Sequence, residues 1–123
     1  QIKEIQTGDR VGYDGTYIAE KSMKIGVLPI GYHDGMDRRL SGVGLVWVGS
    51  ALCPIIGRVS MNLTTIDVSD VDAHEDQEVI FISEQKDSPL SLERQAERAN
   101  MIPYDMLVHL NKEMFRTLSW GTK

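Results

Sequence analysis

The sequence predicts a mainly β fold, a closed or nearly closed antiparallel barrel of Greek-key type with two short C-terminal helices. Short runs rich in β-branched residues, each bounded by Gly, Asp or Ser, occupy the first two thirds of the 123 residues. After residue 88 the apolar residues change from the alternation of strands to the spacing of helices. The close succession of short strands favours a barrel over an open sheet.

The expected strands follow one another through tight turns. Gly49-Ser50 is typical of a hairpin turn between two apolar runs. Residues 65–71 alternate between apolar and polar side chains, as in a strand with one face in solvent. The sequence predicts strands at residues 11–19, 25–30, 45–48, 54–59, 63–68 and 78–82, and a last strand within residues 113–120.

Two helices are expected after the strands. Ser91 has the side chain of a helix N-cap, and apolar residues then recur at helical spacing as far as Ala99. Pro103 ends this helix and can open a second one, because proline is tolerated in the first turn but not in a helix interior. The second helix carries the apolar residues Tyr104, Leu107 and Val108.

Composition excludes several classes of function. The net charge of −5 and the lack of a Lys/Arg cluster argue against nucleic-acid binding. The longest apolar run, LVWV at 45–48, is too short to cross a membrane, and the first ten residues do not resemble a signal peptide. One cysteine excludes an internal disulfide, and three scattered histidines indicate no metal site. We therefore expect one domain (1–123) in the cytoplasm, with no membrane or nucleic-acid partner.

Three glycine-punctuated segments form the candidate functional site. They are VGYDGTY (11–17), IGYHDGMDRRL (30–40) and GRVSMN (57–62), and they fall within 52 residues. Glycine commonly occurs where a chain turns tightly or approaches another group closely. A polar side chain beside such a glycine is a common way to build a site on a rigid scaffold.

Together these segments resemble the C-terminal domain of the alanine racemase family, pyridoxal-phosphate enzymes that interconvert L- and D-alanine. The resemblance covers nearly the whole chain and includes ERANMIPYDMLVHL at 97–110. It implies a homodimer whose active site is shared between subunits and which supplies D-alanine for the cell wall. The cofactor pyridoxal phosphate is expected to bind a lysine of an N-terminal TIM-type barrel that is absent from this chain.

The family chemistry assigns Tyr13 as the catalytic residue. Racemisation removes a proton from one face of the substrate and returns one to the other, so it needs two acid/base groups. In the family one is the cofactor lysine and the other is a tyrosine, which the match places at Tyr13 and not at Tyr17. A free tyrosine has a pKa of about 10, so nearby positive charge must favour its phenolate. That charge would have to come from outside this chain or from arginines such as Arg38 and Arg58.

The remaining site residues follow from the same resemblance. Tyr32 lies 19 residues after Tyr13, the family interval between the catalytic tyrosine and a tyrosine at the active-site entrance. Met61 matches the methionine whose backbone N–H binds the substrate carboxylate, a donor that cannot be deprotonated. The entrance residues implied by the match are Tyr32, Arg38, Arg58 and Ser60, of which the arginines would attract an anionic or zwitterionic substrate.

Several positions depart from the family pattern. Asp14 stands where glycine is usual, and Asn62 replaces a common aspartate. The segment 113–116 differs from the usual ending, and Lys112 stands where some members have a tyrosine near the cofactor phosphate. None of the lysines lies in a cofactor-binding motif, so we expect the isolated chain to be inactive and to bind pyridoxal phosphate weakly.

Two alternatives remain open at this point. The departures at 112–115 leave room for a serine or broad-specificity amino-acid racemase. A non-catalytic barrel that serves dimerisation or ligand binding is the alternative from another class. Three residues have structural interpretations: His33 at a surface turn, Asp34 in a local turn hydrogen bond, and Cys53 as a small buried hydrophobe.

Overall fold

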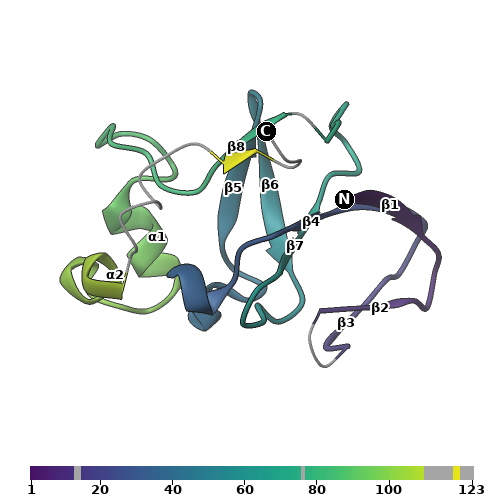
Figure 1. The fold of residues 1–123 in the computed structure, drawn as a ribbon, viewed down its shortest axis with the longest axis horizontal. Helices are drawn as coiled ribbons and strands as arrows, with labels where there is room; N and C mark the ends of the chain where they lie inside the picture. Colours follow the sequence, from purple (N-terminus) through teal and green to yellow (C-terminus); the bar gives the residue numbers. More distant parts are fainter. Residues whose placement is uncertain (13–14, 76, 110–117, 120–123) are drawn as a thin grey trace.

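The computed structural model describes residues 1–12, 15–75, 77–109 and 118–119. The fold is mainly β, with two short helices near one end of the main sheet and the first three strands toward the other (Figure 1). The strands are β1 (Ile2–Ile5), β2 (Arg10–Val11), β3 (Tyr17–Ile18), β4 (Met23–Leu28), β5 (Leu45–Val48), β6 (Ala51–Ile56), β7 (Thr64–Asp67), β8 (Glu78–Ile80) and β9 (Leu118–Ser119).

The strands pair antiparallel throughout the described residues. Seven form one sheet in the order β1-β4-β7-β6-β5-β8-β9, and β2 and β3 form a small separate ribbon. The hairpin of β5 and β6 turns at Gly49-Ser50, with Val48 opposite Ala51, as the sequence predicts. No pair among the described residues joins β9 back to β1, so closure into a barrel stays a prediction.

The prediction of one strand over residues 11–19 is wrong. The segment instead contains β2 and β3, which pair with each other on either side of a turn. Gly12 and Gly15 have φ angles of 92° and 60°, which an extended strand does not adopt. Strand β1 was not predicted; its polar Lys3 and Glu4 are exposed and weaken the apolar alternation. The predicted strand at 45–48 is confirmed as β5, and the bounds of β4, β6, β7 and β8 differ from the prediction by a few residues. Of the last strand predicted within 113–120, residues 118–119 form β9 and the others lie outside the described residues.

Both predicted helices are confirmed. The first, α1 (Leu92–Arg98), is capped by Ser91, whose hydroxyl accepts a hydrogen bond from the Arg94 N–H at 3.3 Å. The second, α2 (Pro103–His109), begins at the proline. Two 3₁₀ turns that were not predicted, η1 (Tyr32–Asp34) and η2 (Arg38–Leu40), shape the segment 30–40.

Two apolar clusters hold the candidate segments in place. Met36 and Leu40 are fully buried in the larger cluster, so the segment 30–40 is anchored beneath its exposed side chains. A smaller cluster lies against the β2–β3 ribbon, where Tyr17 packs onto it. Its buried members are Ile5, Val11, Ala19, Met23, Ile25 and Ile56. In the described part of the chain no helix has the length and apolar character needed to cross a membrane.

Candidate functional site

The segments 30–40 and 57–62 are joined by backbone contacts at Gly31. The Tyr32 N–H donates to the Ser60 carbonyl at 3.0 Å, and the His33 N–H donates to the Met61 carbonyl at 3.0 Å. A Cβ atom at Gly31 would overlap the Ser60 carbonyl oxygen and lie 2.5 Å from the Met61 carbonyl carbon. Only glycine permits this approach, which places Tyr32 beside Met61.

The segment 11–17 contacts the segment 57–62 through Gly12. A Cβ atom at Gly12 would lie 2.6 Å from the backbone nitrogen of Arg58 and 2.9 Å from the Gly57 Cα. The residue before Tyr13 therefore rests on the backbone of Gly57-Arg58. Tyr13 itself, the predicted catalytic residue, and its neighbour Asp14 lie outside the described residues.

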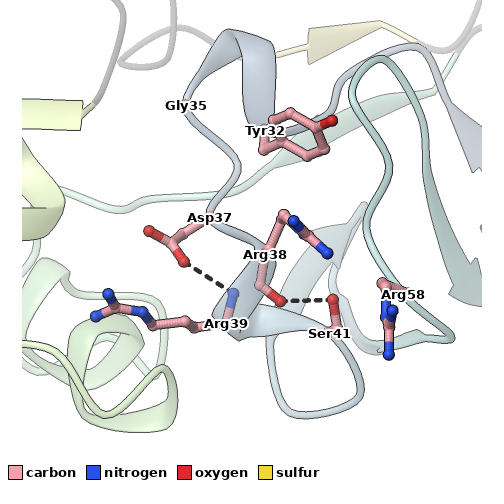
Figure 2. A pocket seen from close by; sticks show the side chains of 7 residues that line it. All are labelled: Tyr32, Gly35, Asp37, Arg38, Arg39, Ser41 and Arg58. Carbon is pink, nitrogen blue, oxygen red and sulfur yellow. Dashed lines mark hydrogen bonds between the residues drawn. The ribbon is translucent and has the colours of Figure 1, made fainter.

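A cleft of about 680 Å³ opens beside these contacts (Figure 2). Tyr32 is 40% exposed, and the Arg38 guanidinium carbon lies 5.5 Å from the centroid of its ring, a distance that allows a cation–π interaction. Three arginines and one aspartate give this cleft a net positive charge. Its lining residues are Tyr32, Gly35, Asp37, Arg38, Arg39, Ser41 and Arg58.

The two neighbouring arginines of η2 lie differently. Figure 2 shows the Arg38 side chain toward Tyr32 and the Arg39 side chain directed away from it. The Asp37 carboxylate accepts a hydrogen bond from the Arg39 backbone N–H at 2.8 Å and so caps the turn. Of the two arginines, Arg38 is therefore the one that faces the predicted entrance tyrosine.

Ser41 links this turn to the segment 57–62, a role that sequence reasoning missed. Its hydroxyl donates to the Arg38 carbonyl at 2.6 Å and accepts from the Val59 N–H at 2.8 Å. No spacing in the sequence relates Ser41 to Val59. Only the fold brings these two residues together, and the link fixes the backbone of η2 beside the cleft.

Met61 and Ser60 occupy the turn that leads into β7. Met61 is 50% exposed, and no described residue accepts a hydrogen bond from its backbone N–H. The Ser60 hydroxyl is engaged within the turn, where it accepts from the Leu63 N–H at 3.0 Å and donates to the Leu63 carbonyl at 3.1 Å. Within the described part of the chain, the Met61 amide thus has no acceptor and lies beside Tyr32.

Arg58 borders two hollows at once. It lines the cleft of Tyr32 and also a smaller one of about 290 Å³ beside Thr16 and Tyr17. Because its backbone also supports Gly12, Arg58 connects the ribbon of β2 and β3 with the cleft. The structure therefore brings together Tyr32, Arg38, Arg58, Ser60 and Met61, which the sequence singled out.

The three structural interpretations are confirmed. The Asp34 carboxylate accepts a hydrogen bond from the Gly31 N–H at 3.1 Å, within its own turn. His33 is exposed, and Cys53 is fully buried in the larger cluster. Burial, together with the negative charge of Asp67, raises the pKa of the Cys53 thiol to about 11. The described residues contain no group of three or more side chains suited to a metal ion.

Comparison with known proteins shows one family throughout. The family model described as alanine racemase, C-terminal domain, matches residues 1–118. An alanine racemase of Vesicomyosocius okutanii subsp. Calyptogena okutanii is 42% identical over 113 residues, which cover 92% of this chain and 31% of the relative. That of Syntrophobacter fumaroxidans is 34% identical over 122 residues, which cover 98% and 32%.

Solved structures give the same result. Alanine racemase from Acinetobacter baumannii has a TM-score of 0.83 and 30% identity, over 94% of this chain and 32% of that chain. The enzyme from Bartonella henselae, with covalently bound pyridoxal phosphate, has a TM-score of 0.80 and 30% identity over the same shares. This chain thus spans about a third of the length of its relatives. The match over residues 1–118 shows that the chain belongs to the alanine racemase C-terminal domain family.

Proposed function

We propose that this domain completes the active site of an alanine racemase in the parent enzyme. Tyr13 is the acid/base group on one face of the substrate, and the Met61 backbone N–H binds the substrate carboxylate. The observation that carries the proposal is the convergence of two separate segments, 11–17 and 30–40, on residues 57–61 of the third. A binding module would not need the segments of Tyr13, Tyr32 and Met61 at one place.

The charges around the cleft support a tyrosine base. A tyrosine with a pKa of about 10 acts as a base near neutral pH only if positive charge favours its phenolate. Gly12, the residue before Tyr13, rests on the backbone of Arg58. The backbone of Arg58 thus lies against the residue that precedes Tyr13, and the Arg38 and Arg58 side chains add positive charge at the cleft.

The donors of the cleft support binding of an amino-acid carboxylate. The Met61 N–H has no acceptor among the described residues, and a backbone amide keeps its proton at any physiological pH. Arg38 and Arg58 attract the negative end of a zwitterionic substrate toward it. Tyr32, stacked against Arg38, narrows the path by which the substrate enters the cleft. Binding, orientation and one proton transfer are thus the tasks that this domain contributes.

The described residues do not fit pyridoxal phosphate by themselves. No described lysine lines the cleft of Tyr32 and Arg38, and the ammonium of Lys24 donates to the Val71 carbonyl at 2.8 Å. The described residues thus offer no lysine at the cleft for covalent attachment of the cofactor. In the proposal the cofactor belongs to an N-terminal domain of the parent, and the active site is shared across a homodimer in the cytoplasm.

The test is Tyr13→Phe in the full-length parent. We expect the variant to fold normally and to lose about 100- to 10,000-fold in kcat, because a positioned acid/base group contributes that much. The value of kcat/KM should fall equally in the two directions, because each direction uses Tyr13 once and the two enantiomers have the same free energy. Initial rates with L- and D-alanine measure both effects.

Tyr17→Phe is the matched control. Tyr17 lies four positions later and packs on the smaller apolar cluster, where its hydroxyl donates a hydrogen bond to the Met23 sulfur at 3.8 Å. Near-normal rates are expected for this variant. Near-normal rates for Tyr13→Phe as well would reject the proposal and favour a non-catalytic module.

A further inference from the structure

We infer that Gly12, Gly31 and Gly57 are positioning residues, whose backbone contacts set the place of Tyr13 relative to the Met61 amide. The inference rests on the proposed function and adds residues to it. A two-base reaction needs its groups placed precisely, because a misplacement of about 1 Å can cost about 100-fold in rate. We call the contact of Gly12 with Gly57 the ribbon seam and the contact of Gly31 with Ser60-Met61 the entrance seam.

The ribbon seam is a mutual contact between two backbones. A Cβ atom at Gly12 would lie 2.6 Å from the backbone nitrogen of Arg58, and one at Gly57 would lie 2.8 Å from the Val11 carbonyl oxygen. Ordinary van der Waals contacts of a Cβ atom begin at about 3.4 Å. Because the opposing atoms belong to the backbone, no change of rotamer relieves the overlap. A methyl group on either side must push the two segments apart.

We expect the displacement at the ribbon seam to fall on Gly12 and not on residues 57–59. Val59 is 1% exposed, and its N–H is held by the Ser41 hydroxyl at 2.8 Å. Thr64, also 1% exposed, fixes the following turn by donating to the Ile30 carbonyl at 2.7 Å. Residues 57–59 are thus held through the buried Val59, and we expect Gly12 to be the side of the ribbon seam that yields.

The entrance seam acts on the other group. A methyl group at Gly31 would overlap the Ser60 carbonyl and crowd the Met61 carbonyl, which accepts from the His33 N–H. To relieve this overlap, the Ser60-Met61 peptide must move or rotate. The Met61 N–H belongs to that peptide. The ribbon seam therefore positions the base, and the entrance seam positions the carboxylate donor.

Two other glycines provide matched controls. Gly8 has the same φ of 92° as Gly12, but a Cβ atom there would meet nothing within 4 Å. Gly42, with φ of 74°, matches Gly57, with φ of 69°, and also has open space. Alanine at Gly8 or Gly42 therefore carries the strain of positive φ without the contact.

The experiment compares alanine variants of the full-length parent. We expect Gly12→Ala and Gly57→Ala to lower kcat about 100-fold. Gly8→Ala and Gly42→Ala should stay within about threefold of the wild type, because conformational strain alone does not move the base. Gly31→Ala should chiefly raise the KM for alanine. An equal loss of kcat in Gly8→Ala and Gly12→Ala would overturn the inference.

A double-mutant cycle separates positioning from a general structural role. If Gly12 acts through Tyr13, Gly12→Ala should cost less than about threefold in the Tyr13→Phe background, because groups that act as a unit are not additive. Full additivity would overturn the inference and leave the proposed function intact. Near-normal rates for Tyr13→Phe alone would instead reject the proposed function.

Folding is checked by circular dichroism and thermal unfolding of each variant. Gly57→Ala tests the ribbon seam from the opposite side if Gly12→Ala does not fold. If neither variant folds while Gly8→Ala and Gly42→Ala do, the seam serves stability and not positioning, and the inference is wrong.

Discussion

At the scale of single residues, Tyr32 and Arg38 illustrate how the cleft obtains its charge. The Arg38 guanidinium lies over the Tyr32 ring, and the Ser41 hydroxyl holds the Arg38 carbonyl. Arg39, its neighbour in the chain, has its side chain directed away from Tyr32 (Figure 2). A pair of adjacent arginines in the sequence therefore yields one residue that faces Tyr32 and one that points elsewhere.

Cys53 provides a test of burial at the same scale. Burial and the charge of Asp67 raise the pKa of its thiol from 9.0 to about 11, so the thiolate that reacts with electrophiles is scarce. We expect iodoacetamide to modify Cys53 slowly at pH 8 in the folded protein and rapidly in urea. Mass spectrometry of timed samples measures both rates, and equal rates would contradict the buried placement.

The same pKa shift has a consequence for stability. Between pH 9 and 11 the folded protein retains the thiol proton that the unfolded chain has lost, so the folded state binds more protons. The free energy of unfolding should therefore fall as the pH rises through this range, and Cys53 should contribute no pH dependence below it. Cys53→Ala should reduce this part of the slope in denaturant unfolding at pH 8 to 11.

At the scale of elements, Gln95 joins helix α1 to the sheet. Its side chain is fully buried, and its amide nitrogen donates to the Leu45 carbonyl at 2.7 Å and to the Phe81 carbonyl at 3.0 Å. Its amide oxygen accepts from Arg98 at 3.0 Å. One side chain thus connects the helix with β5 and with the residue that follows β8.

Removing this connection should destabilise the protein. In Gln95→Met the Leu45 and Phe81 carbonyls lose their amide donor, and each buried group left unsatisfied costs about 1 to 3 kcal/mol. We expect a loss of at least about 2 kcal/mol in the free energy of unfolding, since two groups are affected. Arg94→Met, an exposed change on the same helix, should cost less than about 0.5 kcal/mol.

Denaturant unfolding of the two helix variants decides between the outcomes. A similar midpoint for both would mean that the buried amide contributes little to the docking of α1. The slope of the unfolding curve should stay unchanged, because neither substitution alters the surface exposed on unfolding.

At the scale of the whole molecule, the proposed homodimer makes a prediction about mixed subunits. One full-length variant lacks the cofactor lysine, and the other carries Tyr13→Phe. If each site combines the lysine of one subunit with Tyr13 of the other, a heterodimer has one intact site and one that lacks both groups. We expect each heterodimer to recover about half of the normal activity, although both parent variants are nearly inactive.

Subunit exchange must be measured in the same samples. Two affinity tags on the two variants allow heterodimers to be purified and assayed separately from homodimers. No activity in purified heterodimers would mean that both bases come from one chain. The assignment of this domain to the partner's active site would then be wrong.

Local chemistry alone determined much of this protein. The hairpin at Gly49-Ser50, the alternation in β7, the Ser91 cap of α1 and the start of α2 at Pro103 depend on residues that are neighbours in sequence. The three glycine-punctuated segments were also identified in this way, because their signals are short. The role of Tyr13 stays a prediction, since that residue lies outside the described part of the chain.

Only the tertiary structure decided how these segments meet. The sequence indicates that Gly12, Gly31 and Gly57 allow close approach, but it does not say which backbone each one approaches. The partners of Gly12 and Gly31 lie 45 and 29 residues away, and Ser41 bonds to Val59 across 18 residues. Local preferences do not encode such pairs, because the partners are set by how the sheet and the buried clusters pack. For the same reason residues 11–19 became two short strands around a turn and not one.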